Sequence, residues 1–334
     1  ARLLALRAAY GGGTLTGLLL AGSALLNAEI RLARRTIGTP RGQAPDPSGS
    51  YGRLEPDAEP LQLVVLGDSA AAGLGCETAH QTPGALIAGG MARDLRRRVV
   101  LRVVARTGAR SADLDTQVGR ALRRPVDVAF VLVGANDVTH QVAAAEAARD
   151  LARSVRTLRA AGAEVVVGTC PDLGTVKPVL QPLRTYARYA SRRLAAAQTV
   201  AVVEEGGLAV SLGDLLARSF LEEPHLWSAD RFHPSAAGYR RVVDAVLPSL
   251  LEAAGVAIPV SVPISDSVQD VTVAARVASR EPGLAVETLE GAEGVAAAGP
   301  GRLARLTRRL PLVGRGAPAG PTPGAEEQNA AVDL

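Results

Sequence analysis

The sequence predicts an α/β protein with three layers (α/β/α), in which helices cover both faces of a central parallel sheet of about five strands. Between residues 61 and 255, short apolar runs rich in valine and leucine alternate with longer segments of helix-forming residues. The runs are apolar at nearly every position, as expected for strands that are buried on both faces. Regular alternation of strand and helix favours parallel strands, because each helix crosses back before the next strand begins.

Each element of this fold has its own sequence signal. The strands are short apolar runs, predicted at residues 61–66, 99–104, 126–133, 163–169 and 200–203. Thr82 and Pro83 supply an N-cap and a proline at the first helical position, so a helix begins there and ends in a run of three arginines. Further helices are predicted near residues 111–123, 143–160, 183–197 and 235–254.

Residues 1–38 carry a predicted membrane segment. Residues 8–28 are uncharged and mostly apolar, and at about 1.5 Å per residue they are long enough to cross a bilayer once. Arginines flank this run on both sides, and its three consecutive glycines are tolerated in membrane spans. We therefore expect a membrane-associated protein with a single N-terminal span. A cleaved signal peptide and a soluble helix are the alternatives. The flanking charges are too evenly balanced to assign the side of the membrane.

Two further segments complete the predicted organisation. Residues 39–60 are rich in Pro, Gly, Ser and Asp, which is typical of a linker. Residues 61–255 form the α/β domain. Residues 256–334 change to a composition rich in Ala, Gly, Pro and Val without a second alternating pattern, and predict a low-complexity, largely disordered tail.

Composition excludes several classes of function. A formal net charge of +4 and an aromatic content of 3% argue against nucleic acid as a partner. The two cysteines, Cys76 and Cys170, cannot form a disulfide framework or a four-cysteine zinc site, although a single bridge and two packed thiols both remain open. The sequence contains no phosphate-binding glycine motif, zinc-ligand spacing or calcium loop, so we expect neither a cofactor nor a metal. It leaves the oligomeric state open.

Residues that can carry chemistry follow the predicted strands. In a parallel sheet, ligand sites gather at the carboxyl ends of the strands. The first strand is followed there by Ser69, the second by Gly108 and the third by Asn136. Asp230 and His233 stand just before the last helix. All five residues are therefore expected to converge on one edge of the sheet.

These residue types fit the needs of acyl transfer. A serine hydroxyl becomes a good nucleophile when a neighbouring base takes its proton, and His233 is the predicted base for Ser69. Asp230 would orient the imidazole and stabilise its protonated form. The backbone N–H groups of Ser69 and Gly108 and the side-chain amide of Asn136 are the predicted oxyanion donors.

His140 is the alternative base, since Asp137 stands three residues before it, as Asp230 stands before His233. Placement favours His233. Asp137 and His140 share one loop with Asn136, which already has an oxyanion role to fill.

Three short motifs carry a resemblance to a known family. GDSA at residues 67–70, GAND at 134–137 and DRFHP at 230–234 resemble the blocks of the SGNH (GDSL-like) hydrolase superfamily, which includes lysophospholipases and esterases. The resemblance covers residues 61–255. It implies a flavodoxin-like fold, hydrolysis of an ester or thioester, and the stated roles for Ser69, Gly108, Asn136 and His233. The near absence of lysine beside abundant arginine suggests an actinobacterial type of member.

The substrate is less tightly defined than the site. Trp227 and Phe232 place apolar surface near Asp230 and His233, and could bind a hydrophobic acyl group or simply pack the core. With the predicted membrane segment, a lipid-like ester is one expectation and an acetyl ester the other. Two rival functions remain: an acyltransferase that uses the same triad, and a non-catalytic, membrane-tethered binding module.

Overall fold

The fold is described by a computed structural model of the chain. It describes residues 24, 28–29, 31–32, 43–53, 59–176, 178–213, 220, 222–256, 261–263, 269–270, 275, 278, 284–288 and 303–309.

Five parallel strands form the centre of one sheet, so the predicted fold class is confirmed. Their order in the sheet is β3, β2, β4, β5, β6. They span Val99–Val103, Leu61–Gly67, Val128–Leu132, Glu164–Gly168 and Leu208–Val210, respectively. This is the flavodoxin-like order, in which the first strand in sequence lies between the second and the third. The chain therefore reverses its direction across the sheet at β2, which creates a crevice at the carboxyl ends of β2 and its neighbours.

Antiparallel strands extend this sheet at both edges. Strand β1 (Gly49–Tyr51), within the predicted linker, pairs with β3. At the other edge β9 (Leu284–Thr288) pairs with β6, and β10 (Leu303–Arg309) pairs with β9. Strand β10 also pairs with β7 (Ser261–Pro263) and β8 (Gln269–Asp270). Residues that the composition assigned to a largely disordered tail are thus strands of the central sheet.

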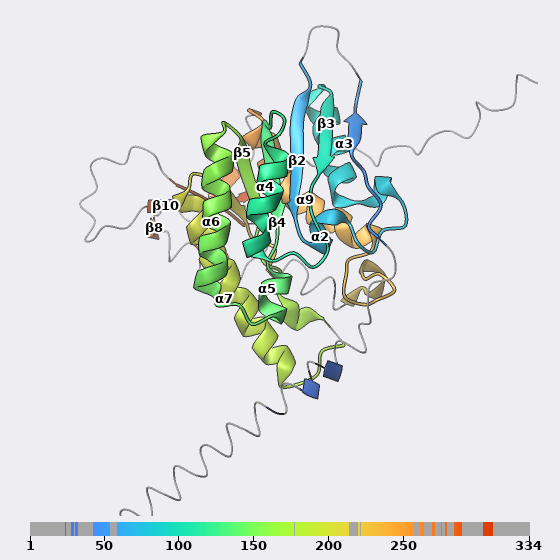
Figure 1. The fold of residues 1–334 in the computed structure, drawn as a ribbon, viewed down its shortest axis with the longest axis vertical. Coiled ribbons are helices and arrows are strands. Elements are labelled where there is room, and N and C mark those ends of the chain that lie inside the picture. Colours follow the sequence, from blue (N-terminus) through green and yellow to red (C-terminus); the bar gives the residue numbers. More distant parts are fainter. Residues whose placement is uncertain are drawn as a thin grey trace, which may run out of the picture.

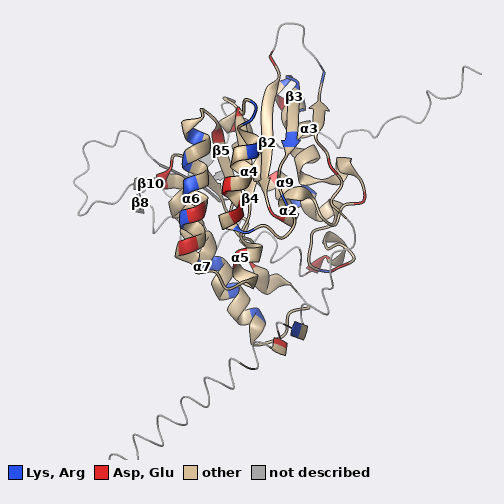
Figure 2. Cartoon of the chain, in the orientation of Figure 1, with Lys and Arg blue, Asp and Glu red and all other residues tan. Residues whose placement is uncertain are grey.

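Helices cover the two faces of the sheet (Figure 1). Helices α4 (Leu114–Ala121), α6 (Ala144–Ala160) and α7 (Leu183–Glu204) pack on one face. Helices α3 (Pro83–Leu95) and α9 (Ala236–Ala253) pack on the other. The side chains of β2 alternate between the two cores, with Val64 and Leu66 on the first face and Leu63 and Val65 on the second. Charged residues of α6 lie along its outward side (Figure 2).

The predicted fifth strand at residues 200–203 is wrong, because these residues belong to α7. The valines at 200, 202 and 203 suggested a strand. However, the buried positions Leu194, Gln198 and Val202 keep the spacing of one helical face, so the helix continues to Glu204. Gly206 and Gly207 then turn the chain, and the fifth parallel strand is β6.

The predicted membrane span at residues 8–28 lies outside the described residues, apart from Ala24 and Ala28, and stays a prediction. Among the helices that the structure describes, none combines the length and the apolar character needed to cross a bilayer. Glu29, which follows the run, is buried, and its carboxylate accepts a hydrogen bond of 2.8 Å from the backbone N–H of Leu183. A carboxylate at this position, the first residue of α7, also interacts favourably with the helix dipole.

Candidate active site

Ser69 lies at the sharp turn between β2 and the short helix α2 (Ser69–Ala72). Asp68 caps this helix by accepting a hydrogen bond from the N–H of Ala70 at 2.9 Å. The turn requires glycine at position 67, where φ is +133° and a Cβ would lie 1.9 Å from the carbonyl oxygen of Leu132. The local sequence therefore places the Ser69 hydroxyl at the carboxyl end of β2, next to β4.

A continuous hydrogen-bonded chain joins Ser69, His233 and Asp230. The Oγ atom of Ser69 is 2.9 Å from Nε2 of His233, and Nδ1 of His233 is 2.7 Å from Oδ2 of Asp230. The sequence predicted that these three residues lie together, although 161 positions separate Ser69 from Asp230 in the chain. When Asp230 is ionised, it accepts a hydrogen bond from the N–H group at Nδ1, so Nε2 carries no proton and can accept one from the serine.

The surroundings of Asp230 keep it ionised. Partial burial acts to raise its pKa, but hydrogen bonds outweigh that effect and hold the pKa below its usual range. The donors are the ring of His233, the backbone N–H groups of His233 and Phe232, and the hydroxyl of Ser228. Asp230 is therefore fixed in position by the same loop that carries His233.

Two of the predicted oxyanion residues, Gly108 and Asn136, lie in segments that contact each other. The side-chain amide of Asn136, at the start of helix α5 (Ala135–Thr139), donates a hydrogen bond of 3.0 Å to the carbonyl oxygen of Ala109. This bond uses one of its two N–H donors. Gly108 has a φ of +81°, which favours glycine, and open space surrounds the place of a Cβ. Their role in binding an oxyanion stays a prediction.

The alternative base, His140, has a different environment. It is exposed, and Nδ1 of its ring lies 2.8 Å from the carbonyl oxygen of Asn136. The carboxylate of Asp137 does not face it but accepts hydrogen bonds from the backbone N–H and the hydroxyl of Ser111, at 3.0–3.1 Å. Asp137 thus joins the loops after β3 and β4, and His233 is the histidine that contacts Ser69.

Two buried glutamines, which sequence reasoning missed, hold the strand ends behind the site. Gln117 of α4 accepts a hydrogen bond from the N–H of Gly67 at 2.7 Å and donates one to its carbonyl at 2.9 Å. Gln198 of α7 accepts from the N–H of Cys170 at 2.7 Å and donates to the carbonyl of Val133 at 3.0 Å. The available signal was a glutamine among the mostly apolar positions of a helical face, since a buried amide needs partners.

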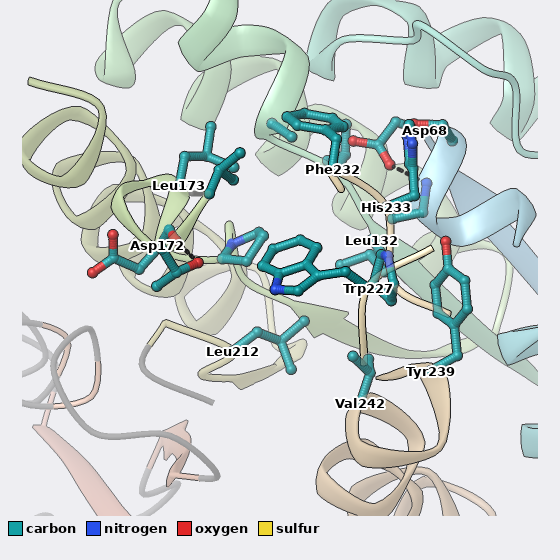
Figure 3. Close-up of a pocket in the computed structure, with 18 residues that line it drawn as sticks. Asp68, Leu132, Asp172, Leu173, Leu212, Trp227, Phe232, His233, Tyr239 and Val242 are labelled. Atoms are coloured by element: carbon teal, nitrogen blue, oxygen red, sulfur yellow. Dashed lines mark hydrogen bonds between the residues drawn. The ribbon is translucent and has the colours of Figure 1, made fainter. Parts of the chain in front are cut away.

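An apolar pocket opens beside Ser69 and His233 (Figure 3). It has a volume of about 60 Å³. Trp227 and Phe232, the predicted substrate-binding residues, both line it and are partly exposed. Its other lining side chains come from the strand ends, from the segment around 3₁₀ helix η3 (Leu173–Thr175) and from α9. Among them are Leu132, Val176, Leu212 and Val242.

Both cysteines are free thiols, so the bridge that the sequence left open is not formed. Burial raises the pKa of Cys76 to about 12 and that of Cys170 well above its usual value. The Cys170 side chain instead packs against Gly134, where a Cβ would lie 2.8 Å from that of the cysteine. In the described parts of the chain, no three His, Cys, Asp or Glu side chains are grouped to hold a metal ion.

Comparison with known proteins identifies a curated relative of this chain. GDSL-like esterase Rv1075c of Mycobacterium tuberculosis is 44% identical over 196 residues, which make up 58% of this chain and 62% of the relative. The chain thus matches less than two thirds of the length of that relative.

Solved structures show likenesses of fold at low sequence identity. TesA is 21% identical with a TM-score of 0.47, over 57% of this chain and 99% of its own. An extracellular lipase from Streptomyces rimosus is 17% identical with a TM-score of 0.42, over 57% of this chain and 99% of its own. Axe2, an acetyl xylan esterase from Geobacillus stearothermophilus, is 19% identical with a TM-score of 0.43, over 57% of this chain and 94% of its own.

A family model supplies the assignment. The model of the GDSL-like lipase/acylhydrolase family matches residues 65–241, which is more than half of the chain and includes Ser69, Asp230 and His233. The chain belongs to the GDSL-like lipase/acylhydrolase family of hydrolases.

Proposed function

We propose that the protein is a serine ester hydrolase in which Ser69 is the nucleophile, His233 the general base and Asp230 the residue that orients the base. The observation that carries this proposal is the unbroken series of short contacts from Ser69 Oγ through the His233 ring to Asp230 at the mouth of an apolar pocket. Family membership and the esterase name of the mycobacterial relative support it.

The reaction follows from the directions of these hydrogen bonds. Nε2 of His233 takes the hydroxyl proton as Ser69 Oγ attacks the ester carbonyl carbon, and the resulting imidazolium is stabilised by Asp230. His233 then gives this proton to the departing alcohol, which leaves an acyl group on Ser69. A water molecule attacks that acyl group while His233 again accepts a proton, and His233 returns this proton to Ser69 Oγ as the bond to the acyl group breaks and the acid is released. Each step uses side chains of this chain, so the proposal calls for no cofactor.

We assign the oxyanion to the backbone N–H groups of Ser69 and Gly108 and the second N–H of Asn136. The contact of Asn136 with Ala109 supports this assignment, because it joins the loop of the asparagine to that of Gly108. Each donor of this kind typically contributes about 3–4 kcal/mol to stabilisation of the transition state.

The substrate is proposed to be a carboxylic ester, either lipid-like or acetyl, whose acyl group enters the pocket between Trp227 and Phe232. The rival acyltransferase would pass the acyl group to an alcohol instead of water. The rival binding module would bind the ester without turnover. Release of free acid, measured with and without added alcohols, separates these three outcomes.

The first experiment measures hydrolysis of p-nitrophenyl acetate by the wild-type chain and by Ser69→Ala. We expect the substitution to abolish turnover while the melting temperature stays within a few degrees, because only one hydroxyl is removed. Turnover that is equal in the two folded proteins would disprove the role of Ser69.

A matched pair of histidine variants tests the base. His233→Ala should lower kcat by about 10³-fold or more, whereas His140→Ala, at the exposed alternative, should leave kcat within about twofold of wild type. The reverse pattern would assign the base to His140.

A further inference from the structure

We propose that Leu212, packed on Gly168, closes the inner end of the pocket and sets the length of the acyl group that Ser69 accepts. The proposal rests on the proposed function and adds a specificity-determining residue to it. It assigns the substrate class as esters of short acyl groups, of two or three carbons, such as acetyl or propionyl.

Burial identifies the inner end of the pocket. Leu132, Leu212 and Val242 line the pocket but are only 4%, 2% and 4% exposed, whereas Trp227 and Phe232 are partly exposed and form its rim. Leu212 and Val242 lie on the side of the Trp227 indole away from Phe232 in Figure 3. An acyl chain that enters past the rim therefore meets the floor formed by these three aliphatic side chains.

Leu212 occupies space that the chain leaves free at Gly168, the last residue of β5. A Cβ on residue 168 would lie 2.8 Å from Cδ1 of Leu212 and 3.4 Å from Cδ1 of Leu132. The φ of Gly168 is not in the region that favours glycine, so the missing side chain here provides room and not a special backbone conformation. The position of the Leu212 side chain, and with it the depth of the pocket, thus depends on a glycine.

The Trp227 side chain at the rim is held in place and cannot easily move to admit a longer acyl group. The indole N–H of Trp227 donates a hydrogen bond of 2.8 Å to the carbonyl oxygen of Phe220. The Phe220 ring, which is fully buried, meets the indole edge to face, with ring centres 4.8 Å apart. Rotating the indole would break both interactions, so a longer acyl chain gains no room on this side.

The volume of the pocket indicates how many carbons of an acyl group it can hold. A cavity of about 150 Å³ in another protein accommodates benzene, which has six carbons. In proportion, the 60 Å³ of this pocket accommodates two or three carbons. The alcohol part of the ester remains outside the pocket, so the proposal limits the acyl group and not the alcohol. Hydrolysis consumes one water and releases a short carboxylic acid.

The test compares kcat/KM of the full chain for p-nitrophenyl acetate, butyrate, hexanoate and octanoate. The kcat/KM of the wild type should be at least tenfold lower for hexanoate than for acetate, since a single misfitting methylene can change kcat/KM by tenfold or more. Leu212→Ala deepens the pocket and should raise the ratio of kcat/KM for hexanoate to that for acetate at least tenfold.

Two further variants separate the proposal from general loosening of the core. Gly168→Ala adds a methyl group that pushes Leu212 into the pocket, and should lower the ratio of butyrate to acetate at least threefold. Leu250→Ala truncates a fully buried leucine of the same core that does not line the pocket, and should leave all ratios within twofold of wild type.

The outcomes that would overturn the proposal are distinct. A wild-type preference for octanoate, or unchanged ratios in both Leu212→Ala and Gly168→Ala, would overturn this proposal and leave the esterase intact. Absence of hydrolysis of every ester by the folded wild-type chain would overturn the proposed function, and this inference with it.

Discussion

Among single residues, Asp68 shows how burial next to the nucleophile creates a dependence on pH. Burial raises its pKa from 3.8 to about 6, against the opposing effect of hydrogen bonds from Ala70 and Ala71 and of the nearby His233. Because the folded-state pKa exceeds the unfolded value, Asp68 favours the folded state most below pH 3.8. This contribution is lost as the pH rises through 6.

Asp68→Asn should therefore stabilise the protein in neutral solution. Asparagine does not titrate, and it retains an oxygen that can accept the hydrogen bond from Ala70 as an N-cap. The gain in the free energy of unfolding should be near zero at pH 3, about 0.5 kcal/mol at pH 4 and about 3 kcal/mol at pH 7.5, from the difference between about 6 and 3.8. Urea unfolding at several pH values measures it. A gain that does not change with pH would contradict this account.

Among single residues, the sequence predicted those whose position follows from the order of strands and helices along the chain. Ser69 could be placed because the carboxyl ends of parallel strands meet at one edge, and Asp230 and His233 because they stand just before the last helix in a motif that resembles a known family. Gln117, Gln198 and Leu212 could not, because their partners are backbone groups or a glycine in distant strands, and only the folded chain brings these together.

Among the elements, helix α7 has two functions, since it covers the sheet and also holds the ends of two strands. Its buried face contacts η3 beside the pocket, and its Gln198 joins the segments that directly follow β4 and β5. Sequence reasoning ended this helix too early because β-branched residues at 200–203 favoured a strand. The buried positions that follow helical spacing were the stronger signal, and burial on a helical face determined the structure there.

The role of Gln198 can be tested against an exposed position in the same helix. Gln198→Ala leaves the N–H of Cys170 and the carbonyl of Val133 without this partner, and each such buried group costs about 1–3 kcal/mol. We expect the free energy of unfolding to fall by about 2–6 kcal/mol. Arg193→Ala, on the exposed side of α7, should change it by at most about 0.5 kcal/mol. Chemical unfolding of both variants measures these changes. Equal losses in the two variants would show that the hydrogen bonds of Gln198 do not stabilise the fold.

In the whole molecule, one sheet combines a parallel centre with antiparallel strands at both edges. Four of its parallel strands, β2 to β5, were predictable because they are continuous apolar runs, whereas the three-residue strand β6 was missed. The edge strands were not predictable, because they are short or lie in Ala- and Gly-rich surroundings, and pairing with a neighbour decides whether such segments become strands. Leu284 and Val286 of β9 are completely buried against β6 and the helices of that face.

Truncation of Leu284 tests how much this edge stabilises the fold. Leu284→Ala in the full chain should lower the free energy of unfolding by about 2–5 kcal/mol, as for other leucines in a packed core. Leu180→Ala, at a leucine that is 51% exposed, should change it by at most about 0.5 kcal/mol. Chemical unfolding followed by tryptophan fluorescence measures both. A loss no larger than in the control would mean that the β9 edge contributes little to the stability of the sheet.

The hydrogen bond between Glu29 and Leu183 limits the distance between the active site and the N-terminal segment. Residues 39–60 were expected to separate the N-terminal segment from the domain, but a residue before this stretch and a strand within it are both attached to the domain. Glu29 contacts α7, and β1 pairs with β3 at one edge of the sheet. Ser191, which receives a hydrogen bond from pocket residue Leu173, is only eight positions or about 12 Å along α7 from Leu183. If the residues before Glu29 are held in a bilayer, the contact of Glu29 with α7 keeps the domain close to the membrane. The pocket then stays at a nearly fixed, short distance from that surface.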